Sequence, residues 1–253
     1  MSDVLLECRN VTAGYGDVEV LHGVTIAVRA GAITALLGNN GAGKTTLMRT
    51  IAGTVPLRSG ALFYAGQPFD KLDAADRVAA GISLVPEGRL VFSDLSVAEN
   101  LRLGAYTPRA RPGRLARAEA MYQMFPRLQE RRYQPAGALS GGEQQMLALA
   151  RGLMSEPRVL LLDEPSLGLA PQVAQQMFEM VAKIRDQGHS VLIVEQDILG
   201  TLGIADYGYV MENGRITTEG TPDVLRDDPN VLASYLGGEI TGAKQSPPAA
   251  SGA

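Results

Sequence analysis

The segment Gly38 to Thr45, GNNGAGKT, contains residues whose types and spacing suit the binding of a phosphate chain. It matches the pattern G-x-x-x-x-G-K-[ST] in full. Its glycines allow the backbone to curl so that successive N–H groups face an anion, and the positive end of a following helix adds to the attraction. Lys44 is expected to reach the β and γ phosphates of a nucleotide, and the Thr45 hydroxyl to bind Mg²⁺. We therefore predict that a nucleotide is bound by Gly38, Asn39, Asn40, Gly41, Ala42, Gly43, Lys44, Thr45 and Thr46.

A second chemical signal is the pair of acids in VLLLDEP, Val159 to Pro165. Four apolar residues predict a buried strand, and the two carboxylates follow at its C-terminal end, where ligands bind in open α/β sheets. In an enzyme with a P-loop, Asp163 would hold Mg²⁺, and Glu164 would orient the attacking water and accept its proton. Taken alone, these residues could equally be solvated acids at the start of a loop. The phosphate-binding motif upstream favours the catalytic interpretation.

The third signal is LSGGEQQ, Leu139 to Gln145. Its serine and glutamate have the spacing of a capping box, and MLALARGLM continues as a helix. A helix start with two glycines also leaves N–H groups accessible to an anion. Two such helix ends in one chain suggest that two chains enclose a nucleotide, each supplying a different end. The second predicted phosphate-binding set is Ser140, Gly141, Gly142 and Glu143.

The elements that must position these residues follow from hydrophobic periodicity. Residues 4–28 read as antiparallel strands around the turn AGYGD, and AITALL, the glycine loop and KTTLMRTIAG read as strand, loop and helix. Asn213-Gly214 marks a hairpin. The fold class is therefore α/β: a P-loop core with a parallel sheet, an N-terminal antiparallel β subdomain and an inserted helical subdomain at about 94–155. Further core strands are predicted at 81–85, 158–162 and 191–194.

Composition limits the other functions. The formal net charge of −4 gives no electrostatic reason to expect nucleic acid as a partner. One cysteine and two histidines exclude an intrachain disulfide and a zinc cluster of the usual kind, so Cys8 is expected to be a buried strand residue. The start of the chain is too polar for a signal sequence, and the sequence has no run of apolar residues long enough to span a membrane. We expect a folded domain at 1–237 and a disordered tail at 238–253.

The P-loop, LSGGEQQ and VLLLDEP, in this order and at these separations, resemble the ATP-binding subunit of ABC transporters over about Val4 to Leu236. The resemblance implies ATP and Mg²⁺ as ligands, an ATPase activity and a peripheral position at the cytoplasmic face of the inner (plasma) membrane. The implied partners are two membrane permease subunits, a second ABC ATPase subunit that is either different or a second copy, and indirectly an external solute-binding protein. It also implies that Tyr15 stacks on adenine and that the loop 166–171 couples two ATP sites. Alone, these would be a turn tyrosine and a helix start.

Two positions depart from the usual family pattern. Glu87 stands where a glutamine usually contacts Mg²⁺ and the attacking water, and its carboxylate is also an oxygen ligand. Gln196 stands where a histidine usually reaches the γ phosphate; its amide can donate a hydrogen bond but cannot titrate. VPEGR together with VEQD is similar to the second ATPase of branched-chain amino-acid importers, with importers of urea or short amides as the alternative. Of the neighbours of Gln196, Glu195 is interpreted as a solvated acid and Asp197 as a solvated acid or a helix cap.

Two functions of other classes are alternatives to a transporter subunit. A soluble ABC ATPase acting on ribosomes or DNA would be expected to have two cassettes or a long coiled coil, and the sequence has neither. A nucleotide-dependent scaffold without hydrolysis is suggested by Glu87 and Gln196, but the intact Asp163 and Glu164 argue against it. The arginines between 109 and 132 are interpreted either as a solvated helical face or as a surface near the anionic leaflet.

Overall fold

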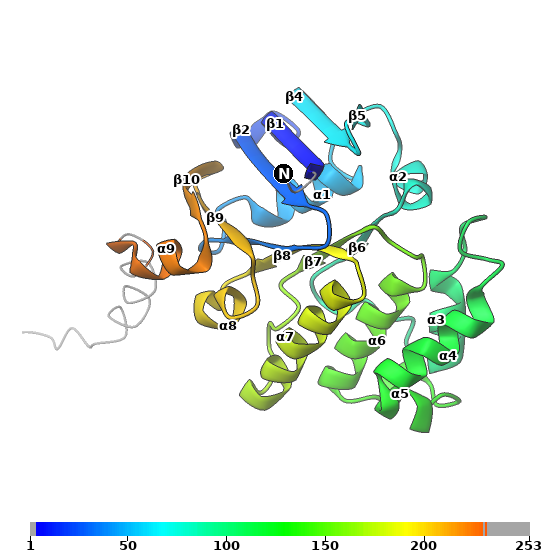
Figure 1. Cartoon of the computed structure of the whole chain (residues 1–253). Coiled ribbons are helices and arrows are strands. Elements are labelled where there is room, and N and C mark those ends of the chain that lie inside the picture. Colours follow the sequence, from blue (N-terminus) through cyan, green and yellow to red (C-terminus); the bar gives the residue numbers. More distant parts are fainter. Residues whose placement is uncertain (1–3, 230, 232–253) are drawn as a thin grey trace, which may run out of the picture.

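The computed structural model describes residues 4–229 and residue 231, and two β-sheets with helices make up its framework (Figure 1). The predicted tail at 238–253 and the end of the predicted domain lie outside the described residues. In chain order the elements are β1 Val4–Tyr15, β2 Val18–Arg29, β3 Ile33–Leu37, α1 Lys44–Ala52, β4 Leu57–Tyr64, β5 Gln67–Pro68, α2 Ala74–Ala80, β6 Ile82–Val85, α3 Val97–Gly104, α4 Arg114–Met124, α5 Pro126–Glu130, η1 Ala136–Ala138, α6 Gly141–Leu153, β7 Val159–Asp163, α7 Pro171–Asp186, β8 Ser190–Glu195, α8 Ile198–Leu202, β9 Tyr207–Glu212, β10 Arg215–Gly220 and α9 Pro222–Asp227.

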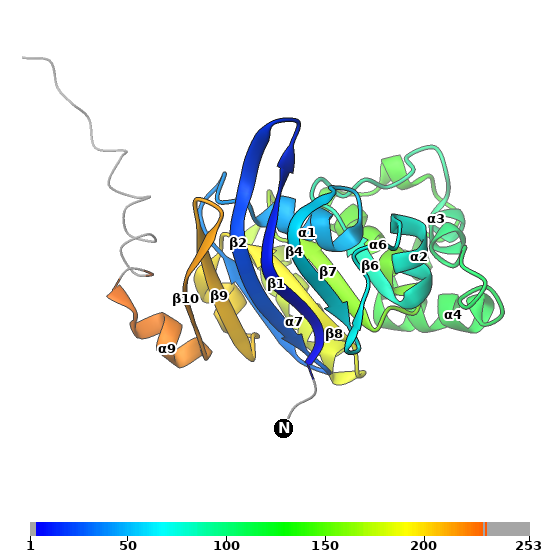
Figure 2. The ribbon, with the colours of Figure 1, turned by 90° about the horizontal axis from the view of Figure 1, so that it is seen from above.

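The first sheet is antiparallel, with the order β2-β1-β4-β5, and Figure 2 shows its long β1–β2 hairpin running across the molecule. The hairpin confirms the predicted antiparallel start, and Cys8 is fully buried in β1. The sequence patterns did not indicate β4 and β5. Gly60 interrupts β4 with a left-handed φ of 89°, where a Cβ would lie 2.4 Å from the carbonyl oxygen of Asn10 at a shift in the β1–β4 register. The glycine permits this close approach of two backbones.

The second sheet has the order β10-β9-β3-β8-β7-β6. Its strands are parallel except for β10, which forms the predicted hairpin with β9 around Asn213-Gly214. Strands β3, β7 and β8 are buried along their whole length, as continuous apolar runs in a covered parallel sheet should be. In register, Leu37 pairs with Glu195 and Asp163 with Val194. The P-loop, the acids after β7 and the polar residues ending β8 therefore leave the same edge of the sheet.

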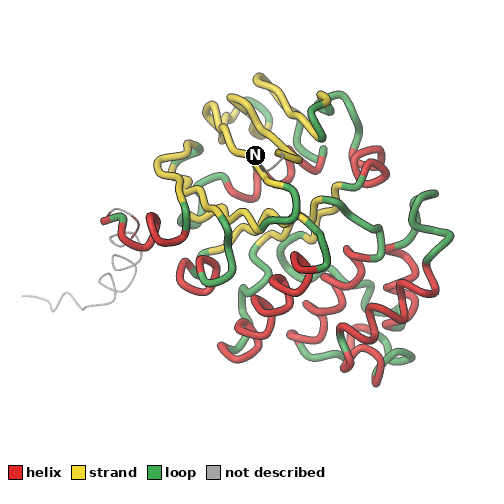
Figure 3. Tube along the Cα trace, in the orientation of Figure 1, coloured by secondary structure: helices red, strands yellow, loops and turns green. Residues whose placement is uncertain are grey.

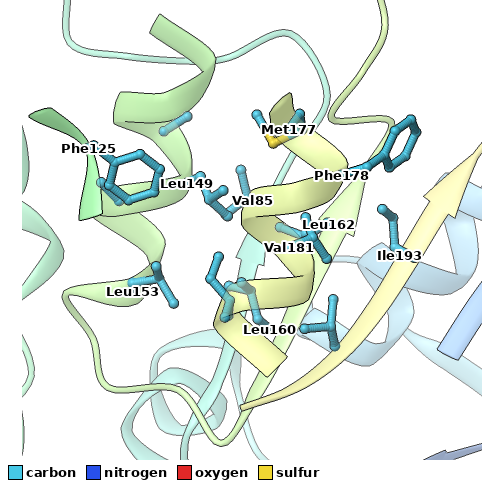
Figure 4. Packing of buried hydrophobic residues seen from close by; sticks show 14 of the residues in the cluster. Val85, Phe125, Leu149, Leu153, Leu160, Leu162, Met177, Phe178, Val181 and Ile193 are labelled. Carbon is cyan, nitrogen blue, oxygen red and sulfur yellow. The ribbon is translucent and has the colours of Figure 1, made fainter. Parts of the chain in front are cut away.

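Alternate residues of these strands serve two cores. On one face, Leu36, Leu161 and Leu192 belong to a cluster that includes the apolar side chains of α1 and of the antiparallel sheet. On the other face, Leu162 and Ile193 pack with α6 and α7. Figure 4 shows this second core, with Leu149 and Leu153 of α6 and Met177, Phe178 and Val181 of α7 gathered over the sheet. The sheet is thus fixed from both sides, which holds its C-terminal edge in place.

The segment between β6 and β7 is helical, and Figure 3 shows its helices on the side of the molecule away from the antiparallel sheet. Both capping boxes predicted there are present: Ser96 with Glu99 at the start of α3, and Ser140 with Glu143 at the start of α6. Helix α6 packs directly on the sheet, because Gly152 lies against the Val85 side chain. Within residues 4–229, no helix combines the length and apolar character that a membrane crossing requires.

Candidate functional site

The loops at the C-terminal edge of the mixed sheet surround a pocket of about 430 Å³. The residues that line it follow the ends of the neighbouring strands β3, β7 and β8, lie in the loop after β6, or, for Val20, belong to β2. They include most of the predicted phosphate-binding loop and four of the five predicted catalytic or metal-binding residues. The lining residues are Val20, Asn40, Gly41, Ala42, Gly43, Lys44, Thr45, Thr46, Glu87, Glu164, Leu167 and Gln196.

The P-loop wraps the start of α1 with backbone groups directed at the pocket. Gly43 is the N-cap residue and supplies no side-chain cap, so the first N–H groups of α1 have no capping side chain. Gly38 begins the loop, where a Cβ would lie 2.2 Å from the carbonyl oxygen of Met211; only glycine fits there. The Lys44 ammonium is buried and donates to the carbonyl oxygens of Gly38 and Asn39 at 2.7 and 3.2 Å. This combination of amides, dipole and cation suits a phosphate chain.

Asp163 and Thr45 meet across the gap between β7 and α1. The Thr45 hydroxyl donates to Oδ1 of Asp163 at 3.1 Å. Burial raises the pKa of Asp163 to about 6, the charges of Glu164 and Glu87 add to the rise, and the hydrogen bond from Thr45 opposes it. A hydroxyl and a buried carboxylate are hard oxygen donors, which suits Mg²⁺ together with phosphate and water oxygens. Among the described residues, no group of three or more His, Cys, Asp or Glu side chains forms a cage of its own for a metal.

Glu164 has a left-handed backbone, with φ of 48°, directly after the buried strand β7. Such a conformation costs about 1–3 kcal/mol for a residue with a side chain and persists where the surroundings impose it. Its N–H donates to the carbonyl oxygen of Val194 at 2.9 Å. Its carboxylate lies 3.3 Å from the Lys44 ammonium and accepts a hydrogen bond of 2.7 Å from the Gln196 amide. The carboxylate is thereby directed into the P-loop pocket, where it can act as a general base.

Glu195 is not the solvated acid expected from the sequence; that interpretation is wrong. Its side chain is buried, and its two oxygens accept hydrogen bonds from the backbone N–H groups of Ser166 and Gln196 at 2.8 and 3.2 Å. Burial raises the pKa of Glu195, while these hydrogen bonds act in the opposite direction. Asp197 is exposed and accepts from the Gly200 N–H, so its interpretation as the cap of α8 is confirmed.

The predicted signature residues lie apart from the P-loop pocket. The Ser140 side chain accepts from the Glu143 N–H and the Glu143 carboxylate from the Ser140 N–H, which closes the capping box at the start of α6. Ser140, Gly142 and Glu143 line a separate hollow between α5, α6 and α7. One chain therefore does not bring its two predicted phosphate-binding helix ends into a common pocket.

Arg89 was not singled out from the sequence, although it follows Glu87 in VPEGR. Its guanidinium lies against the start of α6: a Cβ on Gly141 would be 2.7 Å from Nη1 of Arg89. Its backbone is left-handed, with φ of 68°. A cation thus lies beside the signature glycine, in the same loop that brings Glu87 to the P-loop pocket. The sequence signal that could have identified Arg89 is its position two residues after Glu87.

Tyr15 and the arginines complete the predicted set. Tyr15 ends β1 and is 45% exposed as a residue, and its hydroxyl accepts a hydrogen bond from Arg49. The arginines of 109–132 are not a uniformly solvated face. Arg109 donates to the carbonyl oxygen of Ser155, and Arg131 forms an ion pair of 2.9 Å with Glu143. Burial is the largest single influence on the pKa of Glu143 and raises it. The hydrogen bonds of the capping box and the charges of Arg131 and Arg127 lower this pKa by more, so that the net shift is downward.

Comparison with known proteins places this geometry in a family. The model for a family described as ABC transporter matches residues 21–167. The chain is 44% identical to the high-affinity branched-chain amino acid transport ATP-binding protein BraG of Pseudomonas aeruginosa, over 92% of this chain and 100% of the relative. It is 36% identical to a probable branched-chain amino acid transport ATP-binding protein, LivF, of Archaeoglobus fulgidus, over 87% and 94%. Among solved structures, a nucleotide-free ATP-binding cassette of an ABC transporter has a TM-score of 0.81 at 27% identity, over 92% of this chain and 99% of that one.

Proposed function

This chain belongs to the ABC transporter family as an ATP-binding protein, and we propose that it hydrolyses ATP to energise the uptake of branched-chain amino acids through separate membrane permeases. The hydrolytic part rests on one observation: the Glu164 carboxylate contacts both the Lys44 ammonium and the Gln196 amide beside the P-loop. The cargo is suggested by relatives whose names specify branched-chain amino acid transport. Urea or short amides are the alternative cargo, and transport assays with the assembled importer distinguish them.

In the proposed reaction, the residues 38–46 bind the triphosphate of ATP and Tyr15 stacks on adenine. Gln196 donates to the γ phosphate, and Glu164 orients the attacking water and takes its proton. Mg²⁺ would be held by Thr45 and Asp163, with Glu87 at the edge of the pocket, and would neutralise charge on the phosphate oxygens. The short bond between Gln196 and Glu164 keeps the base beside the place where the γ phosphate would lie.

The separation of the two helix ends supports a dimer. ATP would lie between the P-loop of one subunit and the residues 140–143 of the other, so that only the triphosphate favours the closed state. Hydrolysis at Glu164 would reopen the dimer. The second subunit in this proposal is a different ABC ATPase, and a homodimer would be revealed by ATP-dependent self-association of the purified chain.

A groove of about 510 Å³ between α2, α3 and α6 offers a place for the permease. Its walls include the exposed rings of Phe92 and Tyr106 and the exposed Leu103. The guanidinium of Arg151 lies 5.1 Å from the Phe92 ring centroid. Because an ABC transporter subunit works with membrane proteins, we assign this apolar groove to a cytoplasmic segment of a permease. The complex would lie at the cytoplasmic face of the inner membrane and receive its cargo from an external solute-binding protein.

The test of the proposed function is Glu164→Gln in the complex with its permeases. The amide keeps the size of the side chain but cannot accept the proton, so ATP binding is retained, turnover is lost and a closed ATP-bound dimer accumulates. Steady-state hydrolysis and size-exclusion chromatography with ATP measure these effects. Glu219→Gln, an exposed glutamate of the edge strand β10, is the matched control. Undiminished turnover in Glu164→Gln would remove this residue as the base.

A further inference from the structure

The turn after β7 is held to the end of β8 at two consecutive donors. The Glu164 N–H donates to the carbonyl oxygen of Val194, and the Ser166 N–H donates to a carboxylate oxygen of Glu195 at 2.8 Å. Pro165 lies between them and has no N–H. The first two N–H groups available after Asp163 are therefore both bound by neighbouring residues of β8.

This attachment coincides with the strained part of the site. Glu164 is left-handed, and such a backbone needs its flanking residues to be fixed. Glu195 provides one of these fixed points, from a side chain that is 2% exposed. Its second oxygen accepts from the N–H of Gln196 at 3.2 Å. One buried carboxylate thus holds the backbones on both sides of the Glu164–Gln196 contact.

The same carboxylate adjoins the loop that leads away from the pocket. Ser166 is the first residue of the loop 166–171, which ends where α7 begins at Pro171. Leu167, the next residue, lines the P-loop pocket. A shift of the Ser166 backbone would therefore displace both the base and a wall of the nucleotide pocket.

We infer that Glu195 is a positioning residue for hydrolysis: its carboxylate fixes the Ser166 and Gln196 backbones so that Glu164 and Gln196 stay aligned with the γ phosphate. The inference rests on the proposed ATPase function. Glu195 touches neither nucleotide nor water in this role, and it acts only through the two residues that do. A displacement of the base by about 1 Å is enough to lower a rate by up to about 100-fold.

Two variants of equal length separate this role from simple support of the fold. Glu195→Met fills the buried space but accepts no hydrogen bond. Glu195→Gln keeps one oxygen that can accept the shorter bond, from the Ser166 N–H, and gives up the longer bond from the Gln196 N–H. We expect Glu195→Met to lower kcat at least about 10-fold and Glu195→Gln to stay within about 3-fold of the unmodified chain. KM for ATP should change little in both. Glu195→Met leaves two N–H groups without their acceptor, so its melting temperature should fall by a few degrees while the chain stays folded. Glu219→Gln is again the control.

The proposal is overturned if Glu195→Met keeps full turnover, if both variants lose turnover equally, or if KM for ATP rises as kcat falls. Failure of both variants to fold would assign the carboxylate to the fold alone and would also overturn it. Amide hydrogen exchange at Ser166 gives a readout that does not depend on hydrolysis: exchange should accelerate in Glu195→Met and remain slow in Glu195→Gln. If the unmodified complex does not hydrolyse ATP, the proposed function fails, whereas the exchange experiment still decides the role of Glu195.

Discussion

The side-chain amide of Gln196 lies 2.7 Å from the carboxylate of Glu164, so that the residues directly after the neighbouring strands β7 and β8 meet at the edge of the nucleotide pocket. The donor is an amide that keeps the same charge at every pH at which the protein folds. The site therefore combines a carboxylate base with a neutral hydrogen-bond donor. This pairing leads to the first prediction.

Replacing Gln196 should alter the rate and its pH dependence in separate ways. Gln196→Ala removes the donor and is expected to lower kcat by about 100-fold, since one missing donor to developing charge has an effect of this size. The unmodified protein should show no step in activity near pH ~6.5 that is attributable to this residue, whereas Gln196→His should introduce one. The pH dependence of hydrolysis, measured over about 1.5 pH units on either side of ~7, tests this expectation. The value of kcat at a single pH tests the effect of Gln196→Ala. A step in the unmodified protein that vanishes in Gln196→Ala without loss of ATP binding would contradict this role of Gln196.

Lys44 should be irreplaceable for nucleotide binding. It is 4% exposed, bonded to two P-loop carbonyl oxygens and 3.3 Å from Glu164. Lys44→Ala is expected to weaken ATP binding by about 100-fold or more, corresponding to about 3 kcal/mol for a lost charge-assisted contact. Lys44→Arg should not restore binding, because the larger planar group does not fit the same carbonyl cradle. Titration calorimetry with ATP measures this, and near-normal affinity in Lys44→Arg would show that only the charge matters.

Asp163 should destabilise the nucleotide-free protein at neutral pH. Its pKa rises on folding from its ordinary value of 3.8 to about 6, so the folded state binds its proton more tightly than the unfolded state. This tighter proton binding adds about 3 kcal/mol to the free energy of unfolding below pH 3.8, and the gain is lost as the pH rises through about 6. Asp163→Asn should therefore melt at a higher temperature than the unmodified chain at pH 8, with a smaller difference at pH 5. Equal differences at both pH values would contradict the raised pKa.

The assignment of the apolar groove predicts a separable loss of permease binding. Leu103 is 43% exposed in the groove, and Leu115 is 75% exposed on α4 outside it. Leu103→Glu places a charge in the groove and should abolish co-purification with the permeases while leaving ATP binding intact. Leu115→Glu is the matched control and should have no effect. Loss of the complex in both variants, or in neither, would remove the groove as the docking place.

The sequence predicted the fold best where a feature depends on residues that are close together in the chain. The P-loop lies between β3 and α1, both capping boxes are formed, and Asn213-Gly214 turns a hairpin, because each depends on residues a few positions apart. The strand β4 was missed because its partner, β1, lies some fifty residues away and a glycine breaks its alternation, and β5 was missed because it has two residues and pairs with β4. Their structure depends on a tertiary contact that no local pattern records.

Glu195 illustrates the same limit within the site. A carboxylate that follows four apolar residues at a strand end would ordinarily reach solvent, and the local sequence does not show which segment covers it. The covering segment is the turn at Glu164 and Ser166, more than twenty-five residues earlier in the chain. Arg89 was missed in the same way, because the start of α6 lies beside it only in the folded chain. The sequence predicted most of the residues that line the P-loop pocket, but not the residues that hold them in place.

The position of β8 also decides where the chain can be lengthened. It is bonded on one side to β3, which leads into the P-loop, and on the other to β7, which leads to Asp163 and Glu164. An extra residue within β8 would move each following side chain to the face opposite its present one. Glu195 would then lose its buried position, and Gln196 would lose its place beside Glu164. An extra residue at Gly188, whose Cα faces open space in the turn before β8, leaves that alternation unchanged. Protein engineers who need an insertion point near this site would find it in that turn, and not in the strand itself.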